Sequence, residues 1–329
     1  MAPTVTTPAT REKTSGGAIR NRLKSALPLI VLVALVLVVT SQQRSFLGTS
    51  SVRALLDSMA PILLLALGQT FVILTGGIDL SVAVMASLGT VLLAKWLPAM
   101  GPGAILAMLV CLTLIGLVNG LVSAIAQVPS FIVTLGAMGL WSGVGYAITG
   151  ASTITITEGY GAIGWLGENR IAQIALGSLL AILMAVIVAI AIKVLSRGRS
   201  FHAMGLAERA SLMSGRPTSA IRASAFALSG LFAGLAAILL AASMHSGSPN
   251  LADSLLLPVI AAVVLGGSAI TGGVGGPLLT LVGALIIAVL RVGLSAVGVD
   301  PSFEQIVYGA IVIAAVALTI DRSRLNVVK

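Results

Sequence analysis

The chain has 329 residues, of which 57% are hydrophobic and only 9% are charged, and its mean hydropathy is +1.11. Soluble domains carry about a quarter charged residues, so this composition excludes a soluble enzyme and predicts an integral membrane protein. The net charge of +9 does not indicate nucleic-acid binding, because the basic residues fall between apolar stretches instead of forming one face interleaved with aromatics.

Apolar stretches separated by charged residues, proline and glycine predict an all-α polytopic membrane protein with about ten transmembrane helices. The first stretch follows a basic tail and no small-residue cleavage site comes after it, so we expect a retained anchor instead of a secretory signal. Glycine and alanine spacing in 136–145 and 228–242 favours close helix packing. The predicted spans are 26–41, 54–75, 80–98, 104–126, 130–149, 171–195, 223–244, 255–271, 277–297 and 303–320.

The distribution of basic residues predicts the orientation of these spans. Fourteen of the 19 lysines and arginines fall in the first 25 residues, between Lys193 and Arg222, or after residue 320. The positive-inside rule therefore places both termini in the cytoplasm and requires an even number of spans. We expect cytoplasmic tails at 1–25 and 321–329, and between them a transmembrane domain, 26–320, with a cytoplasmic loop at 196–222.

This predicted cytoplasmic loop is a polar segment between long apolar stretches. Five arginines between Arg197 and Arg222 accompany a single acidic residue, Glu208, so the segment cannot lie in lipid. It is either a solvated basic turn held against anionic membrane lipid or the place where a partner protein binds.

Two glycine-rich interruptions, GGIDLS at 76–81 and GGSAITGGVGG at 266–276, predict broken or re-entrant segments or tight cytoplasmic turns. The two clusters share an apolar-G-G-x-x-x pattern, so they could also belong to the two halves of an internal repeat. Asp79 either caps the following helix by accepting from N–H groups around Val82, or places a carboxylate at an inner gate. The broken-helix glycines are Gly76, Gly77, Gly266, Gly267, Gly272 and Gly273.

Further polar residues fall inside predicted spans. Each is either an interhelical hydrogen-bonding partner or, as a set, part of a pathway for a hydroxyl-rich solute. Glu304 stands in the first turn of the last span, where an acidic side chain stabilises the helix end, and a docking role for an external partner also remains open. With Asp79 and Glu304, the pathway and gate candidates are Gln69, Asn119, Ser130 and Thr134.

Several chemistries are excluded by absent motifs. The chain contains no GxxxxGK[ST] phosphate loop, no HExxH and no GxSxG, so it has no means of hydrolysing ATP itself. A single cysteine, Cys111, excludes a thiolate metal cluster, and His202 and His245 fall on opposite sides of the membrane. We therefore expect no metal and no cofactor on this chain, and energy must come from an ion gradient or from a partner.

Five motifs in order make the chain similar to the permease subunits of ribose-type sugar ABC importers in bacteria. They are ILTGGIDLSVA (73–83), VPSFIVTLGAMGL (128–140), MGLAERASLMSGR (204–216), IAAVVLGGSAITGGVGGPLLTLVGALII (260–287) and QIVYGAIVIAAVAL (305–318). The resemblance implies a type II-like bundle of ten spans and a dimer of permeases in the inner membrane. It also implies a cytoplasmic ABC ATPase, which binds ATP and Mg²⁺, and a periplasmic binding protein that delivers the sugar.

In that family the cytoplasmic loop carries a G-x-N-x-x-A-A-x-x-S-G pattern. Here the asparagine is replaced by Ala207 and the second alanine by Ser211, while a short helix ended by Gly215 and Pro217 can still fit a groove on the ATPase. Leu256 replaces a common glutamate, which points to a different substrate or to a heterodimer whose other subunit supplies the charge. The resemblance implies that the ATPase-coupling residues are Gly205, Glu208, Arg209, Ala210, Ser214 and Gly215.

Together these observations predict a permease subunit that moves a neutral sugar, such as a pentose, a hexose or a related polyol or nucleoside, by alternating access. Few charges in the spans suit an uncharged solute. The alternatives are an ion-coupled secondary transporter or channel, for which Asp79 and Arg291 are the coupling candidates, and a membrane subunit that does not transport. The sequence does not decide between a homodimer and a heterodimer.

Overall fold

The computed structural model describes residues 15–319, an α-helical bundle with only four two-residue strands. Seven of its helices are long and apolar enough to cross a membrane, and three shorter apolar helical segments lie at 26–42, 253–265 and 304–314. These ten elements match the predicted spans one for one, although the count of full-length spans is lower. They are α1 Ser15–Gln42, α2 Thr49–Leu74, α3 Val82–Met100, α4 Gly103–Ile125, α5 Ser130–Thr149, α7 Leu176–Val194, α10 Thr218–Met244, α11 Leu256–Leu265, α12 Pro277–Ala296 and α13 Glu304–Thr319.

The connections contain short elements, of which the sequence indicated only a short helix before Gly215. Two pairs of strands form antiparallel ladders, β1 with β4 and β2 with β3. The loop at 196–222 is helical, as α8 and α9. The short elements are α6 Gly161–Glu168, α8 Ser196–Leu206, α9 Glu208–Met213, η1 Arg44–Leu47, η2 Asp253–Leu255, η3 Pro301–Phe303, β1 Ile154–Thr155, β2 Arg170–Ile171, β3 Ile174–Ala175 and β4 Ser246–Gly247.

Two predicted spans are corrected. The sixth, 171–195, begins only at Leu176, because residues 170–175 pair with each other as the β2–β3 hairpin. The eighth, 255–271, ends at Leu265, because Gly267 takes a left-handed conformation with φ of +88° and the Ser268 N–H bonds back to the Val263 carbonyl. This is a glycine helix cap, and α11 is therefore only ten residues long.

Helix α10 is the centre of the bundle and packs against α4, α2 and α3. Small residues make this packing close: a Cβ on Gly116 would lie 2.1 Å from the Phe226 carbonyl oxygen, and one on Gly230 would lie 2.0 Å from that of Leu112. The packing expected of 228–242 is thus confirmed. In lipid, the dispersion energy of such close contact replaces the hydrophobic effect that drives helix packing in soluble proteins.

Helix α5 is the least buried of the seven helices that are long enough to cross a membrane. Its glycines at 136, 139 and 143 share one face, and nothing in the described chain lies within 4 Å of where their Cβ atoms would be. Within the described residues, the close packing expected of 136–145 is therefore made only at Gly145, where a Cβ would lie 3.3 Å from Pro249 Cβ.

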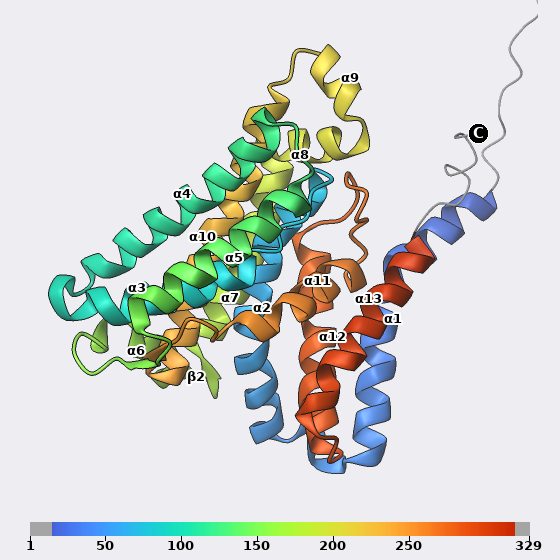
Figure 1. Cartoon of the computed structure of the whole chain (residues 1–329). Helices are drawn as coiled ribbons and strands as arrows, with labels where there is room; N and C mark the ends of the chain where they lie inside the picture. Colours follow the sequence, from blue (N-terminus) through green and yellow to red (C-terminus); the bar gives the residue numbers. More distant parts are fainter. Residues whose placement is uncertain (1–14, 320–329) are drawn as a thin grey trace, which may run out of the picture.

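Figure 1 shows α8 and α9 at one end of the bundle, while α6 and β2 lie at the opposite end. The beginning of α1 and the end of α13 lie toward the same end as α8 and α9. The structure thus places both described ends of the chain on the side of the basic loop.

Candidate functional site

Residues 75–81 form a non-helical loop between α2 and α3 that carries the fully buried carboxyl group of Asp79. One carboxylate oxygen accepts hydrogen bonds from the Ser81 backbone N–H at 2.9 Å and from the Ser81 hydroxyl at 2.6 Å. The other accepts from the Ser229 hydroxyl of α10 at 2.7 Å. Burying a carboxylate is costly unless donors replace its water shell, and these three donors do so.

The expected helix cap at Asp79 is corrected in one detail. Its carboxylate reaches the N–H two residues along, at Ser81, and not the N–H groups around Val82. Ser81 is the N-cap residue of α3 and makes no side-chain capping bond. The aspartate therefore closes the turn that precedes α3, as aspartates often do with the backbone two residues on, and does not cap the helix itself.

Four other predicted pathway residues converge on this loop. With its amide oriented to satisfy both neighbours, Gln69 of α2 donates to the Asp79 carbonyl at 3.1 Å and accepts from the Asp79 N–H at 3.2 Å. Asn119 of α4 donates to the Ser81 hydroxyl at 3.1 Å. On α5, Ser130 accepts from the Ile78 N–H and Thr134 from the Leu80 N–H, both at 3.0 Å.

Several of these contacts satisfy backbone hydrogen-bonding groups of the loop. Backbone groups in a non-helical segment at membrane depth have no water to bond, so side chains from neighbouring helices must satisfy them. Helices α2 and α5 supply such side chains, namely Gln69, Ser130 and Thr134. Asn119 of α4 and Ser229 of α10 instead satisfy the polar side chains of the loop, Ser81 and Asp79. We call residues 75–81 with Gln69, Asn119, Ser130, Thr134 and Ser229 the loop network.

Glu304 lies apart from the loop network. It begins α13, as its first-turn position predicted, and it faces the guanidinium of Arg291 on α12 at 3.6 Å. The Tyr308 hydroxyl donates to it at 3.3 Å. Glu304 and Arg291 thus neutralise each other at the α12–α13 contact, and Asp79 and Arg291 belong to separate polar networks.

The two glycine clusters meet each other. The Gly273 N–H donates to the Leu74 carbonyl at 3.0 Å, so the loop after α11 is hydrogen-bonded to the end of α2. Gly76, like Gly267, is left-handed, with φ of +79°, and the Gly77 N–H bonds back to the Val72 carbonyl as Ser268 does to Val263. The likeness between the two clusters therefore reflects the same helix-ending turn.

The last turn of α8 packs directly on this glycine contact. A Cβ on Gly205 would lie 2.1 Å from the Leu74 carbonyl oxygen and 2.3 Å from the Gly273 nitrogen, and one on Gly272 would lie 2.9 Å from Gly205 Cα. The His202 ring also lies 3.2 Å from the Gly275 carbonyl oxygen. Gly205, expected among the coupling residues, thus faces the membrane domain, and it joins α8 to both glycine loops.

The other predicted coupling residues face outward. Glu208 pairs with Arg222 at 2.6 Å and remains about half exposed. Helix α9 ends at Met213, and Gly215 follows with φ of +76°, as the sequence indicated. Arg209, Ala210 and Ser214 are exposed as well. The surface of this segment also carries three large exposed apolar side chains, Leu206, Leu212 and Met213.

Sequence reasoning missed Ser229, which supplies one of the three donors to Asp79. Its neighbours, Leu228 and Gly230, made it part of a small-residue packing pattern, and it lies 150 positions from Asp79. Among the described residues, no group of three histidine, cysteine, aspartate or glutamate side chains is arranged to hold a metal ion.

The chain resembles known transport proteins over most of its length. Residues 51–316 match the family described as the branched-chain amino acid transport system permease component. The ribose import permease of Bacillus subtilis is 34% identical over 90% of this chain and 92% of its own length. The galactofuranose transporter permease of Escherichia coli is 32% identical over 92% of each chain. The galactose/methyl galactoside import permease of the same organism is 31% identical over 90% of this chain and 94% of its own length. No solved structure gives a significant match.

Proposed function

Because the chain belongs to the family of branched-chain amino acid transport permease components, we propose that it is the membrane subunit of an ATP-driven importer for a neutral sugar. The observation that carries the proposal is its similarity over about 90% of its length to permeases named for ribose, galactofuranose and galactose. The cargo is thus a monosaccharide or a related polyol or nucleoside. The protein resides in the inner membrane of a bacterium, with both termini in the cytoplasm.

Energy reaches this subunit from a separate ATPase, which binds ATP and Mg²⁺. The contact of α8 with both glycine loops supports this arrangement, because a displacement of the cytoplasmic segment pushes on backbone atoms at Leu74 and Gly273. No flexible side chain lies between Gly205 and these backbone atoms. The loop network then passes the displacement to the helices that hold residues 75–81, and alternating access follows from their rearrangement.

The exposed surface of α9 is where the ATPase docks in this proposal. Leu212 is 61% exposed and Met213 87% exposed, and both lie on the helix that begins with Glu208, the partner of Arg222. Large apolar side chains in water at the cytoplasmic end, next to charged groups, are typical of a protein interface.

A double replacement, Leu212→Asp with Met213→Asp, is expected to weaken binding of the ATPase at least about tenfold, because each buried apolar anchor contributes about 1–2 kcal/mol to an interface. Co-purification of the two subunits at graded salt measures the effect. Met100→Asp is the matched control, since Met100 is 51% exposed on the opposite side of the bundle. Equal ATPase recovery from the double variant and the parent would reject this docking surface.

A second permease subunit covers the open face of α5. The glycines at 136, 139 and 143 form a shallow stripe there, and such stripes let another helix approach closely in lipid. Differently tagged copies of this chain, expressed together, test whether the partner is identical: recovery of both tags on one complex supports a homodimer, and its absence supports a heterodimer.

Reconstitution tests the function as a whole. Proteoliposomes containing this permease and its ATPase, supplied with the binding protein, should take up sugar only when ATP is enclosed on the ATPase side. Uptake driven by a proton or sodium gradient without the ATPase would instead identify a secondary transporter. The structure gives that alternative little support, because Asp79 and Arg291 lie in separate networks and each is already hydrogen-bonded or paired.

A further inference from the structure

A pocket of about 250 Å³ opens at the end of the bundle opposite α8 and α9, between α2, α6, α7 and α10. None of the predicted pathway or coupling residues lines it. Its volume lies just below the range of typical ligand pockets, which suits a ligand smaller than the drug-sized molecules that occupy them.

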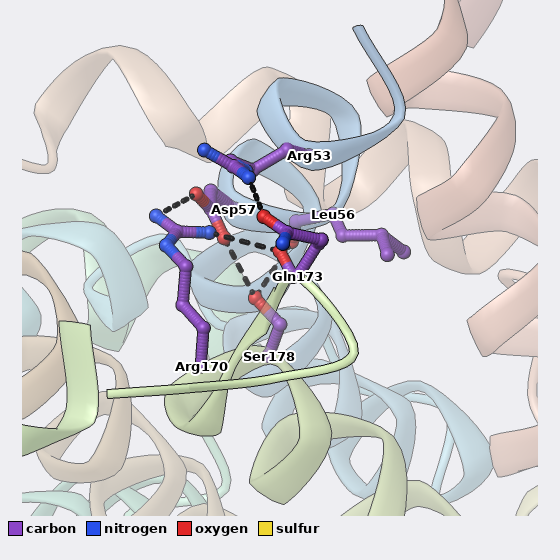
Figure 2. A network of polar contacts seen from close by, with 6 residues as sticks. All are labelled: Arg53, Leu56, Asp57, Arg170, Gln173 and Ser178. Atoms are coloured by element: carbon purple, nitrogen blue, oxygen red, sulfur yellow. Dashed lines mark hydrogen bonds and ion pairs between the residues drawn. The ribbon is translucent and has the colours of Figure 1, made fainter. Parts of the chain in front are cut away.

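One wall of the pocket is a fixed network of donors and acceptors. Figure 2 shows Asp57 of α2 between Arg170 and Ser178. The Arg170 guanidinium donates to one Asp57 oxygen at 2.9 Å, and the Ser178 hydroxyl donates to the other at 3.2 Å. Arg170 also donates to the Gln173 carbonyl at 3.3 Å, and Gln173 accepts from Arg53. The β2–β3 hairpin is thereby held against the beginning of α2, and the wall is formed before any ligand arrives.

The rest of the polar lining is aromatic and acidic. The Tyr160 ring stacks on His245 with centroids 4.3 Å apart, and its hydroxyl donates to the Ala242 carbonyl at 2.8 Å. Burial raises the pKa of Tyr160, and the negative charge of Glu168 raises it further. Glu168 itself is exposed and lines the pocket. It therefore has acceptor capacity toward a ligand.

Apolar side chains complete the lining, among them Pro61, Leu166 and Leu239. A monosaccharide has matching features: pairs of hydroxyls that donate to carboxylates and accept from guanidinium, and C–H faces that pack on apolar surface. Asp57 is already neutralised by Arg170, so the wall they form does not require a charged ligand.

We propose that this outer pocket binds a single monosaccharide through its hydroxyl groups, with Glu168, Asp57 and Arg170 as the polar contacts. The inference rests on the proposed sugar transport and adds a site on the permease itself. The pocket lies at the end where a sugar enters, so it would receive the sugar before the helices rearrange.

Equilibrium binding to the full chain in lipid nanodiscs tests the proposal without transport or ATP. Calorimetric titration with ribose and with galactose should show saturable binding of at least one sugar. Glu168→Gln should weaken it about tenfold or more, because a hydrogen bond to a charged acceptor is lost. Ser243→Phe should abolish it, because Ser243 is exposed in the pocket and a ring there fills the space without disturbing the core.

Two variants and one ligand serve as controls. Glu158→Gln makes the same chemical change at an exposed glutamate that does not line the pocket, and Ser243→Ala leaves the space open, so both should bind within about twofold of the parent. Three results would overturn the proposal. The parent could bind neither sugar, the Ser243→Phe variant could bind sugar as well as the parent, or the pocket could bind ethanolamine in place of sugar. Failure of ATP-driven uptake with sugar binding intact would reject the transport proposal alone.

Discussion

Gly205→Ala is expected to reduce ATP-driven sugar uptake about tenfold or more while the complex continues to hydrolyse ATP. The new Cβ would lie 2.1 Å from the Leu74 carbonyl oxygen and 2.3 Å from the Gly273 nitrogen, and real Cβ atoms do not approach other heavy atoms this closely. Both obstructing atoms are backbone, so no side chain can turn away. Relief requires α8 to separate from the two glycine loops, at a cost of about 1–3 kcal/mol.

Uptake and ATP hydrolysis, measured on the same proteoliposomes, separate loss of coupling from loss of assembly. Gly161→Ala is the matched control, because it makes the same change at a helical glycine with nothing within 4 Å, and it should leave both rates unchanged. Leu206→Ala is a milder second variant: Leu206 is 63% exposed, yet its side chain lies where a Cβ on Gly273 would be. It should reduce uptake less than Gly205→Ala does. Parental uptake by both variants would contradict transmission through this contact.

The helices of this protein are largely predictable from sequence because their ends are marked by glycine chemistry. Gly76 ends α2 where the predicted span ended, at residue 75. Gly267 ends α11 with the same left-handed turn, although the predicted span ran through it to residue 271. The β2–β3 hairpin was not predictable, because residues 170–175 are mostly apolar and read as the start of a span. What stops the helix there is tertiary: Arg170 is bound by Asp57, more than 110 positions away.

The sequence predicted which polar residues belong to the candidate site, but not that they lie together around one loop. Gln69, Asn119, Ser130 and Thr134 stand out in sequence because lipid penalises an unpaired polar group. Their convergence on residues 75–81 depends on how α2, α4 and α5 pack, which no local pattern encodes. Glu304 has the same polar character and yet bonds elsewhere, to α12.

Residues 196–222 show the same limit of sequence-based prediction. The family pattern identified Gly205 with Glu208, Arg209, Ala210, Ser214 and Gly215 as one coupling surface. The structure divides them: Gly205 packs inward on the glycine loops, and the others lie outward. A helix with one face on the membrane domain and the other in water is suited to carry a displacement from a partner to the glycine loops. A docking patch without the inward contact would not transmit it.

Asp79→Asn is expected to abolish most transport while changing the thermal stability of the protein by about 1 kcal/mol or less. An asparagine has the same shape, and its carbonyl oxygen can accept from the Ser81 N–H and hydroxyl as the carboxylate does. The amide nitrogen then faces Ser229, whose hydroxyl can rotate from donor to acceptor. The substitution therefore removes the charge and keeps the turn.

Asp79→Ala is expected to differ by losing stability as well. Three donors from Ser81 and Ser229 would lose their acceptor in a site without solvent, and each buried unsatisfied group costs about 1–3 kcal/mol. Because the two hydroxyls can turn toward other acceptors, we expect a total of about 2–4 kcal/mol. Thermal unfolding of purified protein measures this cost, and uptake by proteoliposomes measures transport.

Asp300→Asn is the matched control, because Asp300 makes the same contact to the N–H two residues along, at Ser302, in an exposed turn. It should change neither measurement. If Asp79→Asn transports at the parental rate, the carboxylate serves only to close the turn before α3. If it fails to transport while unfolding at the parental temperature, the negative charge itself is required, because geometry and hydrogen bonding are retained. The pair of substitutions therefore separates a gate from a structural turn.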